Sequence, residues 1–518
     1  MLDLLFKNAK VLDGTGAPWF RADVGIKDGY IAKIGKITEE AKIVVDATGK
    51  YLAPGFIDAH SHSDYTLLTN PSADSKVMQG VTLEVIGQCG SSAAPRGLGF
   101  TPDEDELPQE VKTPGWTNMA SYLELLEAQG TSINVAPLVG HGTIRRQVMG
   151  SDKRAPNSHE LSLMKDLVSD AMEQGAFGIS TGLIYVPGTF SDTYELLELA
   201  KVASRYGGLY FTHLRDEREK LIEALEEAIE IGFAAEIPVQ ISHLKVMGKS
   251  NWGKVNEAIC AIEKAREKGL DITADQYPYI ASSTGLSAFV PTWVWSGSKD
   301  AGLKRIKDPY QRQKIIEEIS GAEDWASFVI SSLQNEKDEI FIGKNLVEIG
   351  EYLGVSPEEA CLTLLERNNG NVQIINFAMC EEDVKTVMKQ PWVMAGSDAS
   401  SLNKDSAKGK PHPRAYGTFV RILGKYVREE KHLRLEEAVR KMTSLPAMRL
   451  GLQDRGILKE NMRADLVLFD ETEVADKSTF LDPHQYAQGI YWVVVNGVPV
   501  VQDQIHTGKR PGKVLRRS

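Results

Sequence analysis

Six side chains of the types that bind metal ions each follow a short apolar run in the sequence. Neutral imidazoles and a thiolate suit Zn²⁺ and similar borderline ions, and a carboxylate can complete such a site. If the apolar runs are parallel strands of one barrel, their C-terminal ends meet at one mouth, and the six side chains converge there. They are His60, His62, Cys89, His213, His243 and Asp398.

A hydrolytic reaction is the chemistry that this set favours. A catalytic metal site keeps one position open for water, and the metal lowers the pKa of that water from 15.7 to about 7. Asp398 is the expected general base, which takes a proton from the water and later passes it to the leaving nitrogen. An amide needs this second transfer, because a free amide anion is a very poor leaving group.

Each feature alone has a plain structural explanation. The pair His60 and His62 would share one face of a strand, but two of ten histidines can fall this way by chance. A lone cysteine at a strand end is usually a small buried hydrophobe, and a lone Asp or His is often a cap or core residue. The joint placement of all six is what indicates a metal site.

The elements that must position these residues alternate between strand and helix. Eight such strands with crossover helices favour a (β/α)8 barrel, although a doubly wound sheet would also alternate. The expected helices include 159–174, 194–206, 215–232 and 254–268. The expected strands are 55–60, 81–89, 133–141, 176–181, 208–213, 238–243, 270–277 and 392–398.

Both ends of the chain look rich in β-strands. An Asp-Gly turn at 28–29 and an Asn-Gly turn at 496–497 each join two strand-like runs. We expect a small β-sandwich domain built from residues 1–54 and 455–518, beside a barrel of residues 55–454. Two unrelated edge hairpins are the alternative.

One connection in the barrel is too long for a single βα unit. About 115 residues separate Tyr277 from Trp392, and they carry helical segments and several tryptophans. We expect an insertion at about 284–345 that covers the barrel mouth as a lid. The alternative is a barrel strand that has been overlooked in this stretch.

Composition excludes several other classes of protein. The formal net charge is −12 with no block of like charges, so nucleic acid is not an expected partner. Four cysteines without close pairing fit a reducing compartment. No apolar run of about 18 residues and no signal-peptide pattern is found. A cytoplasmic location without membrane association is therefore expected, and the oligomeric state cannot be read.

Several motifs together resemble one family, the N-acyl-D-amino-acid deacylases of the amidohydrolase superfamily. The similarity covers nearly the whole chain, from the N-terminal β segment to MRADLVLFD. The most specific motifs are GQCG, ISHLK and DQYPY, and the others are PGFIDAHSHSD, FTHLRDE, GSD and HPRAYGTF. The loop after GSD is longer and more polar than is common in the family, which leaves substrate preference open.

The resemblance implies a zinc centre and a substrate. Cys89, His213 and His243 would form a tight zinc site, and His60, His62 and Asp398 a weaker second one. The lysine that bridges two metals in several superfamily members is missing from the fourth strand, 178–181. The implied reaction is hydrolysis of a linear N-acyl-D-amino acid, and the preference for D over L rests on the resemblance alone.

The resemblance also implies the contacts of the substrate. The expected contacts of the carboxylate are Lys245, Tyr277, Ser283 and Arg414, and Tyr185 would line the acyl or side-chain pocket. Lys245 could instead be a solvated loop lysine, and Tyr185 could be a packing residue. Of the two tyrosines in YPY, either Tyr277 or Tyr279 could face inward. Asp58 could orient a ligand histidine or cap a turn, and His141 could be a pocket donor or a structural residue.

Two other functions compete with this one. A cyclic-amide hydrolase of the dihydroorotase or hydantoinase kind shares the histidines and the aspartate, but it would favour a lysine on the fourth strand. A non-catalytic barrel would have lost Asp398 or ligand histidines, and all of them are present.

Overall fold

Eight parallel strands form the centre of the computed structural model, which describes residues 1–96 and 115–517. The third strand is interrupted at Leu138, so that β8 pairs with β7 while β9 pairs with β10. The strands are β6 (Phe56–Asp58), β7 (Val81–Ile86), β8 (Asn134–Pro137) with β9 (Val139–Gly140), β10 (Gly178–Gly182), β11 (Leu209–His213), β12 (Val239–Ile241), β13 (Ile272–Gln276) and β17 (Val393–Ala395).

The sheet closes between its first and last strands. The amide of Ala59 donates to the carbonyl of Ala395 at 3.3 Å, and the amide of Asp398 donates to the carbonyl of His60 at 2.8 Å. A doubly wound sheet would leave these edges apart. The predicted (β/α)8 barrel is therefore confirmed, and all eight expected strands are among its members.

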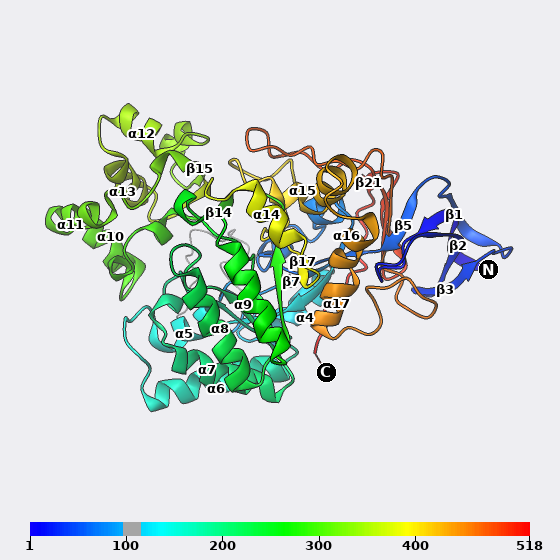
Figure 1. Ribbon diagram of the computed structural model, residues 1–518, viewed down its shortest axis with the longest axis horizontal. Coiled ribbons are helices and arrows are strands. Elements are labelled where there is room, and N and C mark those ends of the chain that lie inside the picture. The colour runs from blue at the N-terminus through cyan, green and yellow to red at the C-terminus, as the bar shows by residue number, and fades with distance from the viewer. Residues whose placement is uncertain (97–114, 518) are drawn as a thin grey trace.

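Helices cover the outside of the barrel between successive strands (Figure 1). Helix α8 begins at Leu221, later than the expected 215, because the preceding residues form a loop at the barrel mouth. The helices of this layer are α5 (His141–Met149), α6 (Ser158–Glu173), α7 (Thr193–Arg205), α8 (Leu221–Ala235), α9 (Val255–Glu267), α14 (Glu381–Met388), α15 (Arg414–Arg421), α16 (Leu435–Met442) and α17 (Ser444–Leu450). The short helices α1 (Thr66–Thr69) and α2 (Asp74–Val77) precede β7, and α4 (Met119–Gln129) precedes β8. No helix of the described residues is long and apolar enough to cross a membrane.

Strands from both termini form one nine-stranded sheet. Phe6 on β1 meets Trp492 on β19 edge to face, with ring centroids 6.0 Å apart, although two strands lie between β1 and β19 in the sheet. The sheet therefore curls around a shared core. Its strands are β1 (Leu2–Val11), β2 (Phe20–Lys27), β3 (Tyr30–Gly35), β4 (Ala41–Asp46), β5 (Tyr51–Pro54), β18 (Leu466–Phe469), β19 (Ile490–Val495), β20 (Val498–Gln502) and β21 (Ile505–His506).

The residues after β21 leave this sheet and return to the barrel. The amide of Gly512 donates to the carbonyl of Thr131 at 2.7 Å, and the amide of Val135 on β8 donates to the carbonyl of Lys513 at 3.0 Å. The end of the chain thus contacts the barrel and not only the small β domain.

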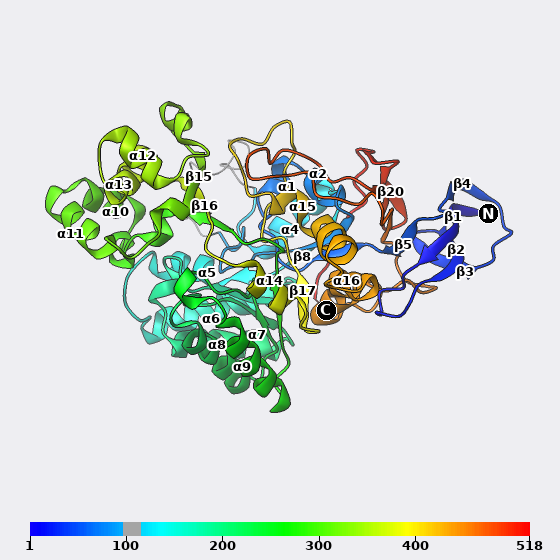
Figure 2. The same ribbon diagram turned by 45° about the horizontal axis from the view of Figure 1, so that its top comes forward.

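The long connection forms a packing unit of its own at the end of the molecule opposite β1–β4 (Figures 1 and 2). An antiparallel sheet of order β14-β16-β15 packs with four helices around a separate apolar core. The unit runs to 376, beyond the expected 345, because β16 is the middle strand of this sheet. Its elements are β14 (Ser282–Gly285), α10 (Lys299–Lys307), α11 (Pro309–Ile319), β15 (Phe328–Leu333), α12 (Leu346–Leu353), α13 (Pro357–Arg367) and β16 (Val372–Asn376).

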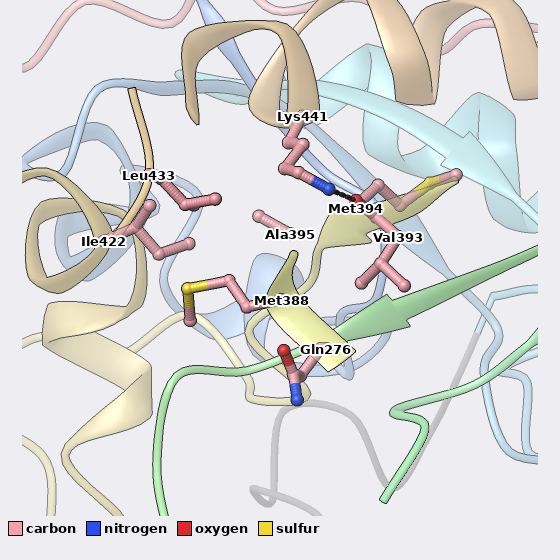
Figure 3. A pocket seen from close by; sticks show the side chains of 8 residues that line it. All are labelled: Gln276, Met388, Val393, Met394, Ala395, Ile422, Leu433 and Lys441. Carbon is pink, nitrogen blue, oxygen red and sulfur yellow. Dashed lines mark hydrogen bonds between the residues drawn. The ribbon is translucent and has the colours of Figure 1, made fainter. Parts of the chain in front are cut away.

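A buried lysine joins α16 to the last barrel strand. Lys441 donates to the carbonyl of Val393 at 2.9 Å and also to the carbonyl of Gln390. Figure 3 shows its ammonium group beside a cavity lined mainly by apolar side chains, among them Met388 and Leu433. Burial lowers the pKa of Lys441 to about 7, because a charged amine is poorly solvated there.

This lysine predicts a pH-dependent stability. The unfolded chain holds the Lys441 proton up to its ordinary pKa of 10.5, whereas the folded chain releases it near pH 7. Stability therefore rises with pH between these values, by about 1 kcal/mol per pH unit. The Tm of the wild type relative to Lys441→Met should increase between pH 7 and pH 9. Lys389→Met, at an exposed position nearby, is the control, and parallel Tm curves for the wild type and Lys441→Met would contradict the prediction.

Candidate functional site

Four of the six predicted metal ligands meet at one point at the C-terminal ends of the strands. The Cys89 Sγ atom lies 3.3 Å from His60 Nε2 and 3.5 Å from His243 Nε2. Asp398 Oδ1 lies 3.4 Å from His60 Nε2. The donor atoms of these four buried residues all lie within 4.8 Å of one another, a spacing that a single ion or a close pair of ions could bridge.

The other two predicted ligands border this cluster. His62 Nε2 lies 3.0 Å from Asp398 Oδ1, and the His213 ring packs edge to face against His243 with centroids 4.3 Å apart. Within the described part of the chain, neither ring nitrogen of the buried His213 has a hydrogen-bond partner. A buried imidazole without a partner is costly, and a metal ion would satisfy it.

The backbone is strained at three of these positions. Cys89, His243 and Asp398 have φ angles of +52°, +37° and +51°, a region that non-glycine residues seldom occupy. Such strain costs roughly 1–3 kcal/mol per residue and persists only where the surroundings impose it. Gly182 permits the approach of the Cys89 loop, because a Cβ atom there would lie 2.0 Å from the Cys89 carbonyl oxygen.

The electrostatic field at this point favours positive charge. Burial raises the pKa of the Cys89 thiol, but His60 and His243 outweigh it and hold that pKa well below its usual value. Burial likewise raises the pKa of Asp398, and Arg414 and the histidines lower it well below its usual value. Burial lowers the pKa of His62, yet the hydrogen bond to Asp398 and the nearby Cys89 raise it to about 9. A thiolate and a carboxylate surrounded by imidazoles form a donor set that fits a zinc-like cation.

Sequence reasoning missed two carboxylates that hold the ligand histidines. Glu217 Oε1 lies 3.1 Å from His243 Nδ1, and Asp275 Oδ1 lies 2.9 Å from His60 Nδ1. Each carboxylate therefore faces the ring nitrogen opposite the one that faces Cys89. The hydrogen bond to Asp275 fixes the tautomer and orientation of His60, as carboxylates do for metal-ligating histidines. His243 Nδ1 also lies 2.8 Å from Lys245 Nζ, so Glu217 and Lys245 together hold the His243 ring. Glu217 is the last residue of FTHLRDE and Asp275 opens DQYPY, but no simple spacing links either to its histidine.

A buried lysine stabilises the seam between the first and last strands. Lys76 Nζ lies 2.7 Å from Asp58 Oδ2 and donates to Ser397 Oγ at 2.7 Å and to the Ala399 carbonyl at 2.8 Å. Asp58 also accepts from the amide of Ser397 at 2.8 Å. Asp58 thus positions the backbone that carries the ligands and does not contact a ligand ring.

Four of the five predicted substrate contacts line one cavity together with His213, His243 and Asp398. They are Tyr185, Lys245, Tyr277 and Ser283. The fifth, Arg414, is not a lining residue but contacts two of them, with Nη1 2.8 Å from Asp398 Oδ2 and Nη2 donating to the Ser283 carbonyl at 3.2 Å. The Arg414 guanidinium stacks on the Tyr277 ring at 4.6 Å.

The structure distinguishes the two tyrosines of YPY. Tyr277 lines the cavity, and its hydroxyl has no hydrogen-bond partner among the described residues. Tyr279 packs beneath Arg421, whose guanidinium lies 4.7 Å from its ring. The inward-facing residue is therefore Tyr277.

Two further positions are settled by their contacts. His141 Nε2 lies 2.7 Å from Glu195 Oε1, so it links α5 to α7 and is not part of the ligand cluster. Thr181, near the end of β10, has its hydroxyl 2.8 Å from that of Thr212. Strand β10 thus carries no lysine, and Thr181 near its end is hydrogen-bonded to the neighbouring strand β11.

The chain is similar over its whole length to known proteins of one family. The model of the amidohydrolase family matches residues 43–245 and 362–501. The D-aminoacylase of Alcaligenes xylosoxydans xylosoxydans is 38% identical over 100% of this chain and 98% of its own length. The N-acyl-D-glutamate deacylase of the same organism is also 38% identical, over 100% and 97%.

Solved structures of D-amino-acid deacylases also superpose on this chain over nearly its whole length. The N-acyl-D-glutamate deacylase of Bordetella bronchiseptica, complexed with zinc and a phosphonate inhibitor, superposes with a TM-score of 0.86 at 36% identity and 99% coverage of both chains. A D-aminoacylase gives 0.85 at 36% identity and full coverage. A D-hydantoinase, at 16% identity over 100% of this chain and 99% of its own with a TM-score of 0.59, shares the fold.

The position of Glu217 generates a prediction about metal affinity. Glu217→Gln removes the charge beside His243 and His213, so zinc affinity should fall by about 10–100-fold. Zinc retained after dialysis against a graded series of chelator concentrations measures this change. Glu219→Gln, two residues away on an exposed part of the same loop, is the matched control. Zinc retention in Glu217→Gln equal to that of the wild type would exclude a positioning role. A lower Tm of metal-free Glu217→Gln than of the metal-free wild type would also exclude it, because the loss of zinc would then follow from a general loss of stability.

Proposed function

Since this chain belongs to the amidohydrolase family, we propose that it hydrolyses the amide bond of N-acyl-D-amino acids, releasing a carboxylate and a free D-amino acid. The observation that carries the proposal is the meeting of Cys89, His60, His243 and Asp398 beside a cavity lined by four of the predicted substrate contacts. Full-length similarity to deacylases named for D-amino acids supports the substrate class.

Zinc is the proposed cofactor. The family resemblance assigns the tight site to Cys89, His213 and His243 and a second, weaker site to His60, His62 and Asp398. In the structure the donor atoms that lie within 4.8 Å of one another form two groups, His60 with Cys89, His243 and Asp398, and His213 with Glu217 and His243. When bound, a zinc ion would lower the pKa of a water molecule to about 7 and polarise the substrate carbonyl. The thiolate favours zinc over magnesium or calcium.

Asp398 is the proposed general base. Arg414 holds its Oδ2 atom at 2.8 Å, so that Oδ1 points toward His62 and His60. In this orientation Oδ1 can accept a proton from the attacking water and then deliver it to the amide nitrogen. That delivery allows the D-amino acid to leave as a neutral amine.

Arg414 and Tyr277 are the proposed principal contacts of the substrate carboxylate. Tyr277 lines the cavity, Arg414 contacts the lining residues Asp398 and Ser283, and the Arg414 Nε atom and the Tyr277 hydroxyl have no hydrogen-bond partner among the described residues. A guanidinium N–H forms a strong, charge-assisted hydrogen bond to a carboxylate. Lys245 and Arg414 each already face a protein carboxylate, Glu217 at 2.6 Å and Asp398 at 2.8 Å, but Arg414 keeps this buried Nε–H group, so we assign Lys245 a supporting role. Ser283, which also lines the cavity, is assigned a supporting role as well.

Three further parts of the proposal each rest on a separate observation. The insertion would act as a wall or lid, because Ser283, Thr284 and Phe289 all line the cavity. A cytoplasmic location is supported by the four free cysteines. A cyclic-amide hydrolase is disfavoured, because the fourth barrel strand, β10, carries no lysine that could bridge two metals.

The role of Asp398 predicts a separation between metal binding and turnover. Asp398→Asn should keep the tight zinc ion and lose about 10²–10⁴-fold in kcat, because an amide cannot accept the proton. Release of free amine from N-acetyl-D-amino acids measures kcat, with the L-forms and hydantoins as comparison substrates. Asp405→Asn, an exposed change on the following loop, is the control. Wild-type turnover in Asp398→Asn would exclude it as the base, and release only from hydantoins would overturn the proposed function.

A further inference from the structure

The histidine of the HPRAYGTF motif lies buried between the barrel and the insertion. His412 Nε2 lies 2.9 Å from the carbonyl oxygen of Ala281, which directly precedes β14, the first strand of the insertion. His412 Nδ1 accepts from the backbone amide of Arg414, the first residue of α15, at 3.0 Å. One imidazole ring, in a residue that is 4% exposed, therefore joins the start of the insertion to the backbone of the proposed carboxylate contact.

The two backbone partners define the protonation state of this ring. A carbonyl oxygen can only accept a hydrogen bond, so Nε2 carries the hydrogen, and a backbone amide can only donate, so Nδ1 carries the lone pair. Burial and the positive charge of Arg414 lower the pKa of His412 well below its usual value. The neutral ring with its hydrogen on Nε2 is the one state that makes both bonds at once.

The Arg414 side chain binds the same segment two residues further on. Its Nη2 atom donates to the carbonyl of Ser283 at 3.2 Å. β14 is an edge strand of the insertion sheet, and its opposite edge pairs with β16. Carbonyls two residues apart along an extended segment point the same way, so His412 and Arg414 bind the edge of this segment that does not face β16.

Aromatic packing holds the His412 ring in this orientation. The ring meets Tyr279 and Phe480 edge to face, with centroids 5.1 and 5.0 Å apart, and Tyr277 in the same manner at 6.2 Å. Tyr277 in turn stacks on the Arg414 guanidinium. The two proposed contacts of the substrate carboxylate thus both touch His412, whereas His412 itself is not among the described residues that line the cavity.

We propose that His412 is a positioning residue, which holds Arg414 and Ser283 in the arrangement that binds the α-carboxylate of the substrate. This inference rests on the proposed function. The α-carboxylate does not react, so its contacts contribute equally to substrate and transition-state binding, and weakening them raises KM with little change in kcat. Loss of the His412 contacts should therefore raise KM by about 10–100-fold, the scale of a misplaced hydrogen bond to a charged group.

The test compares His412→Phe, which keeps an aromatic ring but forms neither hydrogen bond, with the wild type, both loaded with zinc. Two substrates are used: the N-acetyl-D-amino acid that the wild type turns over fastest, and its primary carboxamide, which lacks the negative charge. KM for the acid should rise by about 10–100-fold and kcat should stay within about threefold of wild type. The kcat/KM for the carboxamide should change little, because its binding does not depend on a charge-assisted bond to Arg414.

A second variant separates the two hydrogen bonds and serves if His412→Phe does not fold. In His412→Asn the side-chain oxygen can still accept from the Arg414 amide, as asparagine does two residues ahead in turns, but the side chain is too short to reach Ala281. KM for the acid should then rise by about 3–10-fold, the scale of one neutral hydrogen bond. His432→Phe is the matched control, because His432 Nε2 makes the same kind of bond to the Lys385 carbonyl, at 2.9 Å, away from the cavity.

Two results would overturn the inference and leave the proposed function standing. One is a wild-type KM for the acid in the folded His412 variants, with zinc content and Tm as the measure of folding. The other is an equal fall in kcat/KM for the acid and the carboxamide, which marks a general loss of structure. No release of amine from any N-acetyl-D-amino acid by the wild type would instead refute the proposed function, and this inference with it.

Discussion

Burial of two negative charges beside several imidazoles is the constraint on which the rest of this structure depends. The Cys89 thiolate and the Asp398 carboxylate lie in a desolvated mouth, where isolated anions are strongly disfavoured. A bound cation offsets that cost, and the surroundings are arranged for one. Strained φ angles aim Cys89, His243 and Asp398 at a common point, and Glu217 and Asp275 hold the far sides of the histidine rings.

A buried ion pair and hydrogen bonds stabilise the seam between the first and last barrel strands, next to the cluster of proposed ligands. The first and last strands join where the proposed ligands His60 and Asp398 lie, and Lys76 crosses this seam to bind Asp58 and Ser397. Any loosening there would move a histidine and the proposed base relative to each other. The residues that close the barrel thus also fix the positions of the proposed ligands relative to one another. This double role explains why several buried charged residues lie close together below the barrel mouth.

Much of this arrangement could be predicted from the sequence. Apolar runs that end in His, Cys or Asp predicted the strands and the candidate ligands together, because side chains at the ends of parallel strands must converge. The carboxylates of Glu217 and Asp275 could not be found in this way, since Glu217 lies in the loop after β11 and Asp275 within β13, and each faces a histidine that follows a different strand. Either tyrosine of YPY suited the cavity until packing distinguished Tyr277 from Tyr279. The insertion extends to 376 because β16 pairs between two earlier strands, a long-range contact that no local pattern reports.

The central claim is that Cys89 and histidine imidazoles bind one zinc ion at this mouth, and X-ray absorption at the zinc edge tests it most directly. The protein loaded with one equivalent of zinc should show a single sulfur ligand at about 2.3 Å and nitrogen ligands at about 2.0–2.1 Å. A spectrum with only oxygen and nitrogen neighbours would contradict the account, because the thiolate would then lie outside the coordination sphere.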